Sequence, residues 1–243
     1  MPVKIVETAE FDLKRPVLVE GFPGVGLVGT IAASYLVEKL KMNMLGYITS
    51  EKFPPIAAVH NKMPLHPARI YKSQKNNLLV LFSEFIIPLQ SIHDLSEKIL
   101  EWCIEKEVRE IISLGGIAVK GQEDVVFGIA STPKLVEELE ANGVKTITEG
   151  ATTGVSGVLL ADCCSRNFPA ISLLADSKPE FLDPKAAALV IEALKKFVNI
   201  KISTTELIAE SVNIEGRMKE MMYKARDAHS NYKKVEEIGP MYG

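Results

Sequence analysis

Short apolar runs alternate along most of the chain with segments in which apolar side chains recur at helical spacing. The runs 17–20 and 111–114 are typical of strands buried on both faces of a sheet. In contrast, Ile92, Leu95 and Ile99 form a stripe with a period near 3.6, which predicts an amphipathic helix. Strands that alternate with helices in this way predict an α/β fold, a single domain built around one mixed sheet flanked by helices.

Caps and turn residues mark the ends of these elements. Thr132-Pro133 and Asp183-Pro184 each place an N-cap residue before a proline, the pattern of a helix start. Strands 56–60 and 68–71 are expected to pair across the loop 61–67. The predicted strands are 3–6, 17–20, 45–50, 56–60, 68–71, 78–82, 111–114, 125–130, 144–148 and 170–174, and the predicted helices are 27–40, 88–105, 134–140, 154–167 and 186–198.

The C-terminal part of the chain has a different pattern, because strands cease at about residue 204. Apolar positions there alternate in steps of four and three, a 3.5-residue period typical of a helix that packs along a partner helix. We therefore divide the chain into an α/β core domain (1–203), a helical docking or oligomerisation segment (204–238) and a flexible tail (239–243). The stripe consists of Ile214, Met218, Met221, Ala225, Ala228, Tyr232 and Val235.

Composition narrows the class of protein. Of the 243 residues, 47% are hydrophobic and 24% are charged, which is ordinary for a globular protein with a sizeable core. The net charge of −3 provides no basic surface for nucleic acid. Because no run reaches the ~18 apolar residues of a membrane span and the N-terminus lacks a signal-peptide pattern, we expect a cytoplasmic protein without a membrane partner.

No set of side chains in the sequence predicts a catalytic or metal site. The three cysteines have no C-x-x-C spacing and are expected to be buried apolar residues. The four histidines include no i, i+4 pair, and no serine lies in a G-x-S-x-G turn. Ser83-Glu84 and Asp162 are not accompanied in the sequence by the base and oxyanion donor that a nucleophilic catalytic site needs. We therefore expect a protein that is not an enzyme and holds no metal or cofactor.

Gly24, Gly26 and Gly29 have the spacing G-x-G-x-x-G between a predicted strand and a predicted helix. One interpretation is a phosphate-binding turn at a helix N-terminus, with Glu51 after the next strand holding a ribose. The other is a tight turn whose glycines let a helix pack closely against the sheet. The spacing alone leaves both open. Gly115-Gly116 at the predicted end of a strand is a further indication of a cleft.

The chain ends with Met241-Tyr242-Gly243, after Gly239-Pro240, which ends any helix. These residues combine an apolar side chain, an aromatic hydroxyl and a terminal carboxylate. Such a tail suits an apolar pocket with one cation, since capture of a carboxylate is a recurring mode of peptide recognition. The alternative is a frayed end without a role.

Several motifs together carry a resemblance to a known family. A signature from Glu20 to Gly29 contains Gly21, Phe22, Pro23, Gly24, Gly26 and Gly29, and it is accompanied by Phe53-Pro54-Pro55, Ala68-Arg69-Ile70-Tyr71, Gly115-Gly116, Thr153-Gly154 and Asp183-Pro184. Over roughly residues 14–235 the chain resembles the archaeal proteasome-assembly-chaperone family. Asn61-Lys62 departs from the family pattern, in which this turn contains a glycine.

The resemblance implies an α/β domain with a topology akin to that of nucleoside phosphorylases but without their activity. It also implies a helical C-terminal region that self-associates. Family members with a hydrophobic-tyrosine-any-residue tail insert it into pockets between α-subunits of the 20S proteasome. By this resemblance Met241 would fill the apolar position, Tyr242 would pack against gate-controlling residues and the Gly243 carboxylate would pair with a pocket lysine.

We therefore expect a non-enzymatic archaeal homo-oligomer, with a tetramer favoured, that assists proteasome assembly or opens the gate without ATP. In the C-terminal helix, Met218, Met221 and Met222, with Tyr232, would also offer an adaptable apolar surface to unfolded clients. Two alternatives stay open. One is a nucleotide-binding or phosphorylase-like enzyme that uses the glycine turn, and the other is an oligomeric scaffold with an inert tail.

Overall fold

The computed structural model describes residues 3–119, 124–177 and 182–209, together with positions 220 and 224. The strands are β1 (Lys4–Glu7), β2 (Val17–Gly21), β3 (Asn43–Thr49), β4 (Ala58–His60), β5 (Met63–Leu65), β6 (Ala68–Ser73), β7 (Leu78–Ser83), β8 (Glu110–Ile117), β9 (Val126–Ala130), β10 (Lys145–Thr146) and β11 (Ala170–Asp176). The helices are α1 (Val28–Lys39), α2 (Ile92–Glu105), α3 (Pro133–Ala141), α4 (Gly154–Ser165), α5 (Pro184–Leu194) and α6 (Thr205–Ala209), with 3-10 turns at Val25–Leu27 and Leu89–Ser91.

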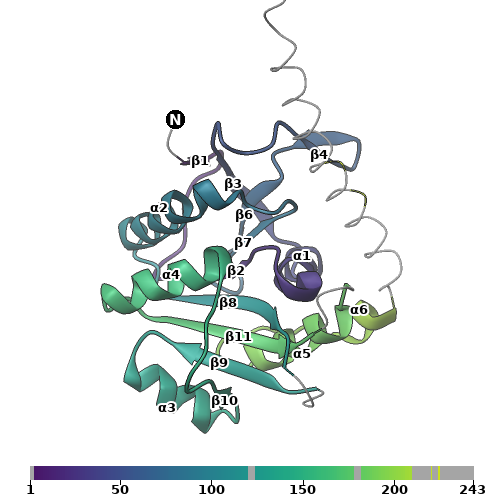
Figure 1. Cartoon of the computed structure of the whole chain (residues 1–243). Helices are drawn as coiled ribbons and strands as arrows, with labels where there is room; N and C mark the ends of the chain where they lie inside the picture. The colour runs from purple at the N-terminus through teal and green to yellow at the C-terminus, as the bar shows by residue number, and fades with distance from the viewer. Residues whose placement is uncertain (1–2, 120–123, 178–181, 210–219, 221–223, 225–243) are drawn as a thin grey trace, which may run out of the picture.

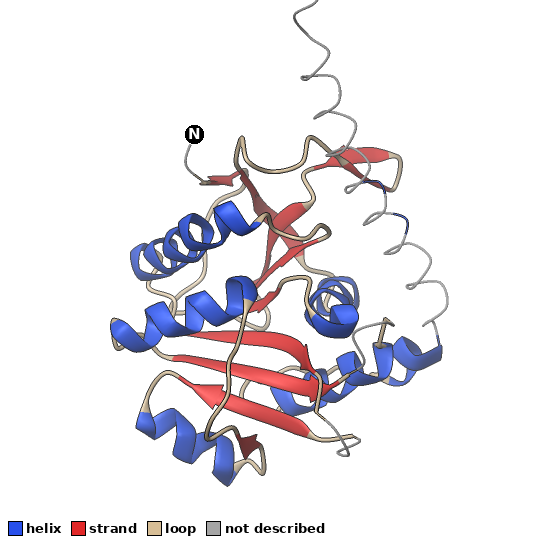
Figure 2. Ribbon diagram, in the orientation of Figure 1, coloured by secondary structure: helices blue, strands red, loops and turns tan. Residues whose placement is uncertain are grey.

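A mixed sheet forms the centre of the domain, and helices cover both of its faces (Figures 1 and 2). Within the described residues it has nine strands in the order β1-β3-β6-β7-β2-β8-β11-β9-β10. The central strand β2 runs parallel to β7 on one side and to β8 on the other, and it is buried along its whole length. The single-domain α/β fold predicted from the alternating pattern is confirmed.

The two faces of the sheet belong to two separate apolar cores, because successive side chains of a strand point to opposite faces. Val17 and Val19 of β2 join the core beneath α1 and α5, whereas Leu18 joins the core beneath α2 and α4. Figure 1 shows these two helix pairs on opposite sides of the sheet. Residue 20 of β2 therefore faces α2 and α4.

The expected pairing of 56–60 with 68–71 is wrong. β4 pairs with β5 in a small antiparallel hairpin outside the main sheet, and β6 pairs with β3 and β7 instead. The cause is the turn Asn61-Lys62, in which both residues have left-handed backbones (φ 50° and 66°). Such a two-residue turn closes a hairpin at once, before the chain reaches β6.

Strand β8 does not end at Gly115-Gly116, as the sequence led us to expect. It continues to Ile117, and both glycines stay in register with β11, opposite Leu174 and Ala175. The two glycines therefore form part of the sheet rather than a cleft-forming turn. The lack of a side chain at Gly116 allows the carbonyl oxygen of Val25 to lie against the end of β8.

The continuous described chain ends with the short helix α6, which is held against α1. The Tyr35 hydroxyl donates to the Ser203 carbonyl (2.8 Å), and the Lys39 ammonium pairs with the Glu206 carboxylate (2.5 Å). Most of the predicted C-terminal helical segment, 204–238, and the whole tail, 239–243, lie outside the described residues. Among the described helices, none is long and apolar enough to cross a membrane.

Candidate functional site: the glycine signature turn

The signature turn, residues 21–29, leaves the central strand β2 and enters α1, so the predicted strand, turn and helix are confirmed. Gly26 and Leu27 have left-handed backbones, with φ of 62° and 50°. Glycine adopts this conformation freely, but a branched side chain such as Leu27 does so at a cost of roughly 1–2 kcal/mol. The turn is thus a sharp and strained bend at the middle of the sheet.

The glycines of the turn bring backbone segments into direct contact. A Cβ atom at Gly21 would overlap the carbonyl oxygen of Gly29, and a Cβ at Gly29 would overlap the carbonyl oxygen of Leu114. Because neither glycine has a side chain, the backbone at the start of α1 lies in direct contact with the backbones of β2 and β8. This is the close-packing role that the sequence left open as the second interpretation.

The turn also covers the carboxyl ends of the next two strands. The Val25 carbonyl oxygen lies against Gly116 of β8, and Gly26 lies against the Ser177 side chain, which follows β11; a Cβ at either glycine would overlap these atoms. The Gly26 carbonyl accepts a hydrogen bond from the Asp183 amide (3.0 Å), at the N-cap of α5. In an open α/β sheet a ligand binds in the crevice beyond these strand ends, and here the turn itself packs over them.

The structure separates the turn from the acidic residue that a dinucleotide would need. Glu51 follows β3, and both β6 and β7 lie between β3 and β2. Three strand spacings amount to about 14 Å. The glycine spacing is therefore explained by packing, with one exception: a Cβ at Gly24 would meet nothing within 4 Å.

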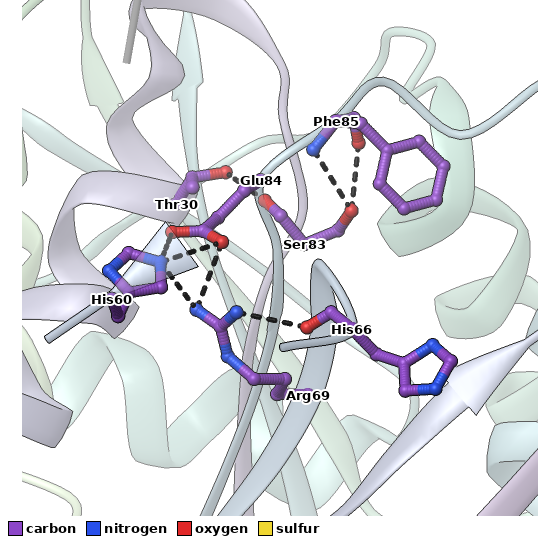
Figure 3. A network of polar contacts seen from close by, with 7 residues as sticks. All are labelled: Thr30, His60, His66, Arg69, Ser83, Glu84 and Phe85. Carbon is purple, nitrogen blue, oxygen red and sulfur yellow. Dashed lines mark hydrogen bonds and ion pairs between the residues drawn. The ribbon is translucent and has the colours of Figure 1, made fainter. Parts of the chain in front are cut away.

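A buried ion pair lies beside the start of α1 (Figure 3). The Arg69 guanidinium, on a side chain only 2% exposed, pairs with the Glu84 carboxylate (3.0 Å), and His60 approaches the same carboxylate (2.9 Å). Arg69 also donates to the His66 carbonyl (2.9 Å). These contacts fasten the β4–β5 hairpin and its flanks to the end of β7, so the network has a structural role.

Ser83, which precedes Glu84 in the chain, also makes hydrogen bonds that stabilise the local backbone. The Ser83 hydroxyl donates to the Phe85 carbonyl (2.8 Å), and the Thr30 hydroxyl of α1 donates to the Ser83 carbonyl (3.3 Å). The Ser83 hydroxyl is therefore bonded to the backbone of Phe85 on both sides, as donor and as acceptor. Cys103 and Cys163 are buried as expected, but Cys164 is exposed, which corrects that part of the prediction.

The sequence analysis assigned no role to Glu20, the first residue of the signature. Its side chain is completely buried, and burial raises the pKa of its carboxyl group from 4.5 to about 7. The hydroxyls of Ser113 and Ser156 and the Phe22 amide lower this pKa in part. The available signal was a charged residue inside the otherwise apolar run 17–20.

The remaining predicted site residues lie outside the described residues. They are Met241, Tyr242 and Gly243 of the tail, and Met218, Met221, Met222 and Tyr232 of the C-terminal helix. In the part of the chain that is described, no group of three or more histidine, cysteine, aspartate or glutamate side chains could hold a metal ion.

With this geometry established, the chain can be compared with known proteins. The sequence profile of the PAC2 family matches residues 18–222. This chain belongs to the PAC2 family. An uncharacterized protein of Methanocaldococcus jannaschii is 34% identical to this PAC2 protein over 237 residues, covering 95% of this chain and 98% of the relative.

Two solved structures share the fold of this PAC2 protein. Pyrococcus furiosus PbaA, an archaeal homolog of proteasome-assembly chaperone, superimposes with a TM-score of 0.83 at 32% identity, covering 93% of this chain and 100% of PbaA. Pyrococcus furiosus PbaB, an archaeal proteasome activator, has a TM-score of 0.75 at 26% identity, covering 97% and 99% of the two chains. The family resemblance and the α/β fold expected from the sequence are both confirmed.

Proposed function

We propose that this PAC2 protein is a non-enzymatic, cytoplasmic proteasome-binding factor that acts in assembly and as an ATP-independent activator. The observation that carries the proposal is the joint occurrence of the PbaA- and PbaB-like fold and a Met241-Tyr242-Gly243 terminus. The tail would enter pockets between α-subunits of the 20S proteasome. There Met241 would supply the apolar contact, Tyr242 the aromatic one and Gly243 the carboxylate.

A homo-oligomer, with a tetramer favoured, would present several tails to one α-ring. Single short tails bind weakly, and linked tails gain affinity through effective concentration. Residues 214–235 would form the contact between subunits, because their apolar stripe has the period of paired helices. Met218, Met221 and Met222, together with Tyr232, would offer unfolded clients an adaptable apolar surface.

The packing of the signature turn supports the absence of nucleotide chemistry in this proposal. Gly21, Gly26 and Gly29 lie where a Cβ atom would overlap neighbouring atoms, and Glu51 lies about three strands away. The turn then serves to place α1 against the sheet.

The test is peptide hydrolysis by an archaeal 20S proteasome with the full-length protein added. We expect stimulation that is lost when residues 241–243 are removed or when Tyr242→Ala is introduced. A matched control exchanges Met241 and Tyr242 in sequence, which keeps the composition and the terminal carboxylate but breaks the pattern, and it should be inactive. Equal stimulation by the intact and truncated proteins, or neither stimulation nor co-migration with α-rings, would contradict the proposal.

A further inference from the structure

Glu20 belongs to a row of polar side chains that crosses three neighbouring strands inside the core. It lies opposite Ser113 of β8, and Ser113 lies opposite Ser172 of β11. All three side chains are essentially buried, with exposed fractions of 0%, 2% and 2%. Residues two positions earlier in these strands, such as Leu18 and Ile111, belong to the core beneath α2 and α4. The polar row therefore faces those two helices.

Among the described residues, the hydrogen-bond donors that face the Glu20 carboxyl group are all neutral. Neither carboxyl oxygen has a hydrogen bond of good geometry, although the Ser113 and Ser156 hydroxyls and the Phe22 amide face the group. Among the described residues, no lysine, arginine or histidine contributes to its pKa. An ionised carboxylate in this setting would be shielded from bulk solvent and, among the described residues, without a counterion, which is costly.

Two thiols of the described residues share the core around Glu20, and the charged side chains of Asp162 and Arg166 act on one of them, Cys163. Helix α4 brings the Cys163 thiol, whose pKa burial raises to about 12, and α2 brings the Cys103 thiol beside it, whose pKa burial raises well above its usual range. On the β7 side Glu20 lies opposite the apolar Leu81. Within this part of the core, Glu20 is thus the group that can change its charge near neutral pH.

The Glu20 carboxyl group lies between the end of β2 and the start of α4. Glu20 immediately precedes the signature turn, and Ser156 lies in the first turn of α4. The N-cap residue of that helix, Thr153, makes no side-chain capping bond, so the start of α4 is held by its packing against α2 and the sheet. In α2, the Ser96 hydroxyl donates one long hydrogen bond to the Val155 carbonyl (3.3 Å), at the start of α4.

We propose that Glu20 is a proton-sensitive switch that controls the packing of α4 on the sheet beneath the signature turn. When the carboxyl group is protonated, it stays buried and the start of α4, at Ser156, stays packed over it. When it is ionised, it requires water, so α4 opens from the sheet more often. The open form has an ordinary carboxyl pKa because the group is then solvated.

The sign and range of the effect follow from the two pKa values. The closed form binds the proton more tightly than the open form, so opening becomes more frequent as pH rises from 4.5 to about 7 and is constant above that. Across this range the opening equilibrium of α4 should rise about tenfold per pH unit. Hydrogen exchange of the α4 amides in the full-length protein, expressed as protection factors to remove the intrinsic pH effect, measures this directly.

Three variants test whether Glu20 causes the pH dependence of α4 opening. Glu20→Gln should make the protection of α4 independent of pH, and Ser113→Ala should extend the pH-dependent range upward, since a hydroxyl that favours ionisation is lost. The matched control is Glu110→Gln at the start of β8. Glu110 is also buried with a raised pKa, owing to burial and then to Glu138, and should leave the α4 profile unchanged.

Two results would overturn the proposal. One is an α4 protection factor that does not change with pH in the unsubstituted protein, and the other is the same pH slope in Glu20→Gln. Should that variant fail to fold, carbon-13 labelling of glutamate and infrared spectroscopy of the unsubstituted protein provide a separate check. The infrared spectrum should show the band of a buried carboxylic acid that disappears as pH rises to about 7. If Glu20 is ionised over the whole pH range, the switch is refuted.

Discussion

The carbonyl oxygen of Val25 lies so close to Gly116 that any Cβ atom at residue 116 would overlap it. One residue of the signature turn is thus seated on a glycine about 90 residues away in the sequence, at the end of the neighbouring strand β8. This relationship explains why a glycine occupies position 116, because Gly116 and the signature turn are the two sides of a single backbone contact.

The first prediction concerns this contact. Gly116→Ala should lower the free energy of unfolding by about 1–3 kcal/mol, since the added methyl group overpacks a backbone contact. Gly24→Ala is the control, because its Cβ would point into open space and its φ of −153° suits any residue. It should change stability by less than about 0.5 kcal/mol. Denaturant unfolding of both variants measures the difference, and equal effects would show that the contact is not tight.

The second prediction concerns stability as a function of pH. Because the folded state raises the Glu20 pKa from 4.5 to about 7, the folded protein binds this proton more tightly than the unfolded chain. The contribution of Glu20 to stability is therefore fully present below 4.5, falls as pH rises, and is lost above about 7. The total loss is on the order of 3 kcal/mol. Glu20→Gln should remove this part of the pH dependence in unfolding experiments.

The third prediction concerns the ion pair of Arg69 and Glu84. Glu84→Gln leaves the buried guanidinium without its counterion, which should cost about 3–5 kcal/mol of stability. Glu97→Gln is the control, since Glu97 and Arg166 form an exposed pair, and such pairs contribute at most about 1 kcal/mol. Thermal unfolding distinguishes the two, and a neutral Glu84→Gln would mean that water solvates Arg69.

The fourth prediction concerns nucleotides. A ligand at 100 times its dissociation constant stabilises a folded protein by ~2.7 kcal/mol. Because the signature turn packs over the strand ends, NAD and ATP should leave the thermal midpoint unchanged. A clear upward shift with either nucleotide that disappears in Gly24→Leu would revive the phosphate-binding interpretation of the glycines.

Local chemistry made much of the fold predictable. Thr132 and Asp183 were expected to cap helices, and their side chains accept hydrogen bonds from the amides of Leu135 and Ala186. The strand, turn and helix around Gly24, Gly26 and Gly29 were also predicted correctly. In each case a few neighbouring residues determine the backbone, so the sequence signal is strong.

The errors arose where long-range contacts or unusual backbones decide the outcome. The β4–β5 hairpin was missed because Lys62 carries no recognisable preference for the left-handed conformation that it adopts. The continuation of β8 through Gly115-Gly116 depends on pairing with β11, which lies far away in the sequence. The role of Glu20 depends on complete burial by other elements, which no local pattern records.

The β4–β5 hairpin stands outside the main sheet, with Val59 and Met63 largely exposed. Residues next to a two-residue turn exchange hydrogen bonds, so His60 and Met63 face each other and the next pair, Val59 and Pro64, directs its backbone groups outward. Pro64 has no N–H to offer at that open edge. Pro64 thereby hinders the addition of another strand at the β5 edge of the exposed ribbon, one of the ways in which proteins limit aggregation at an open edge.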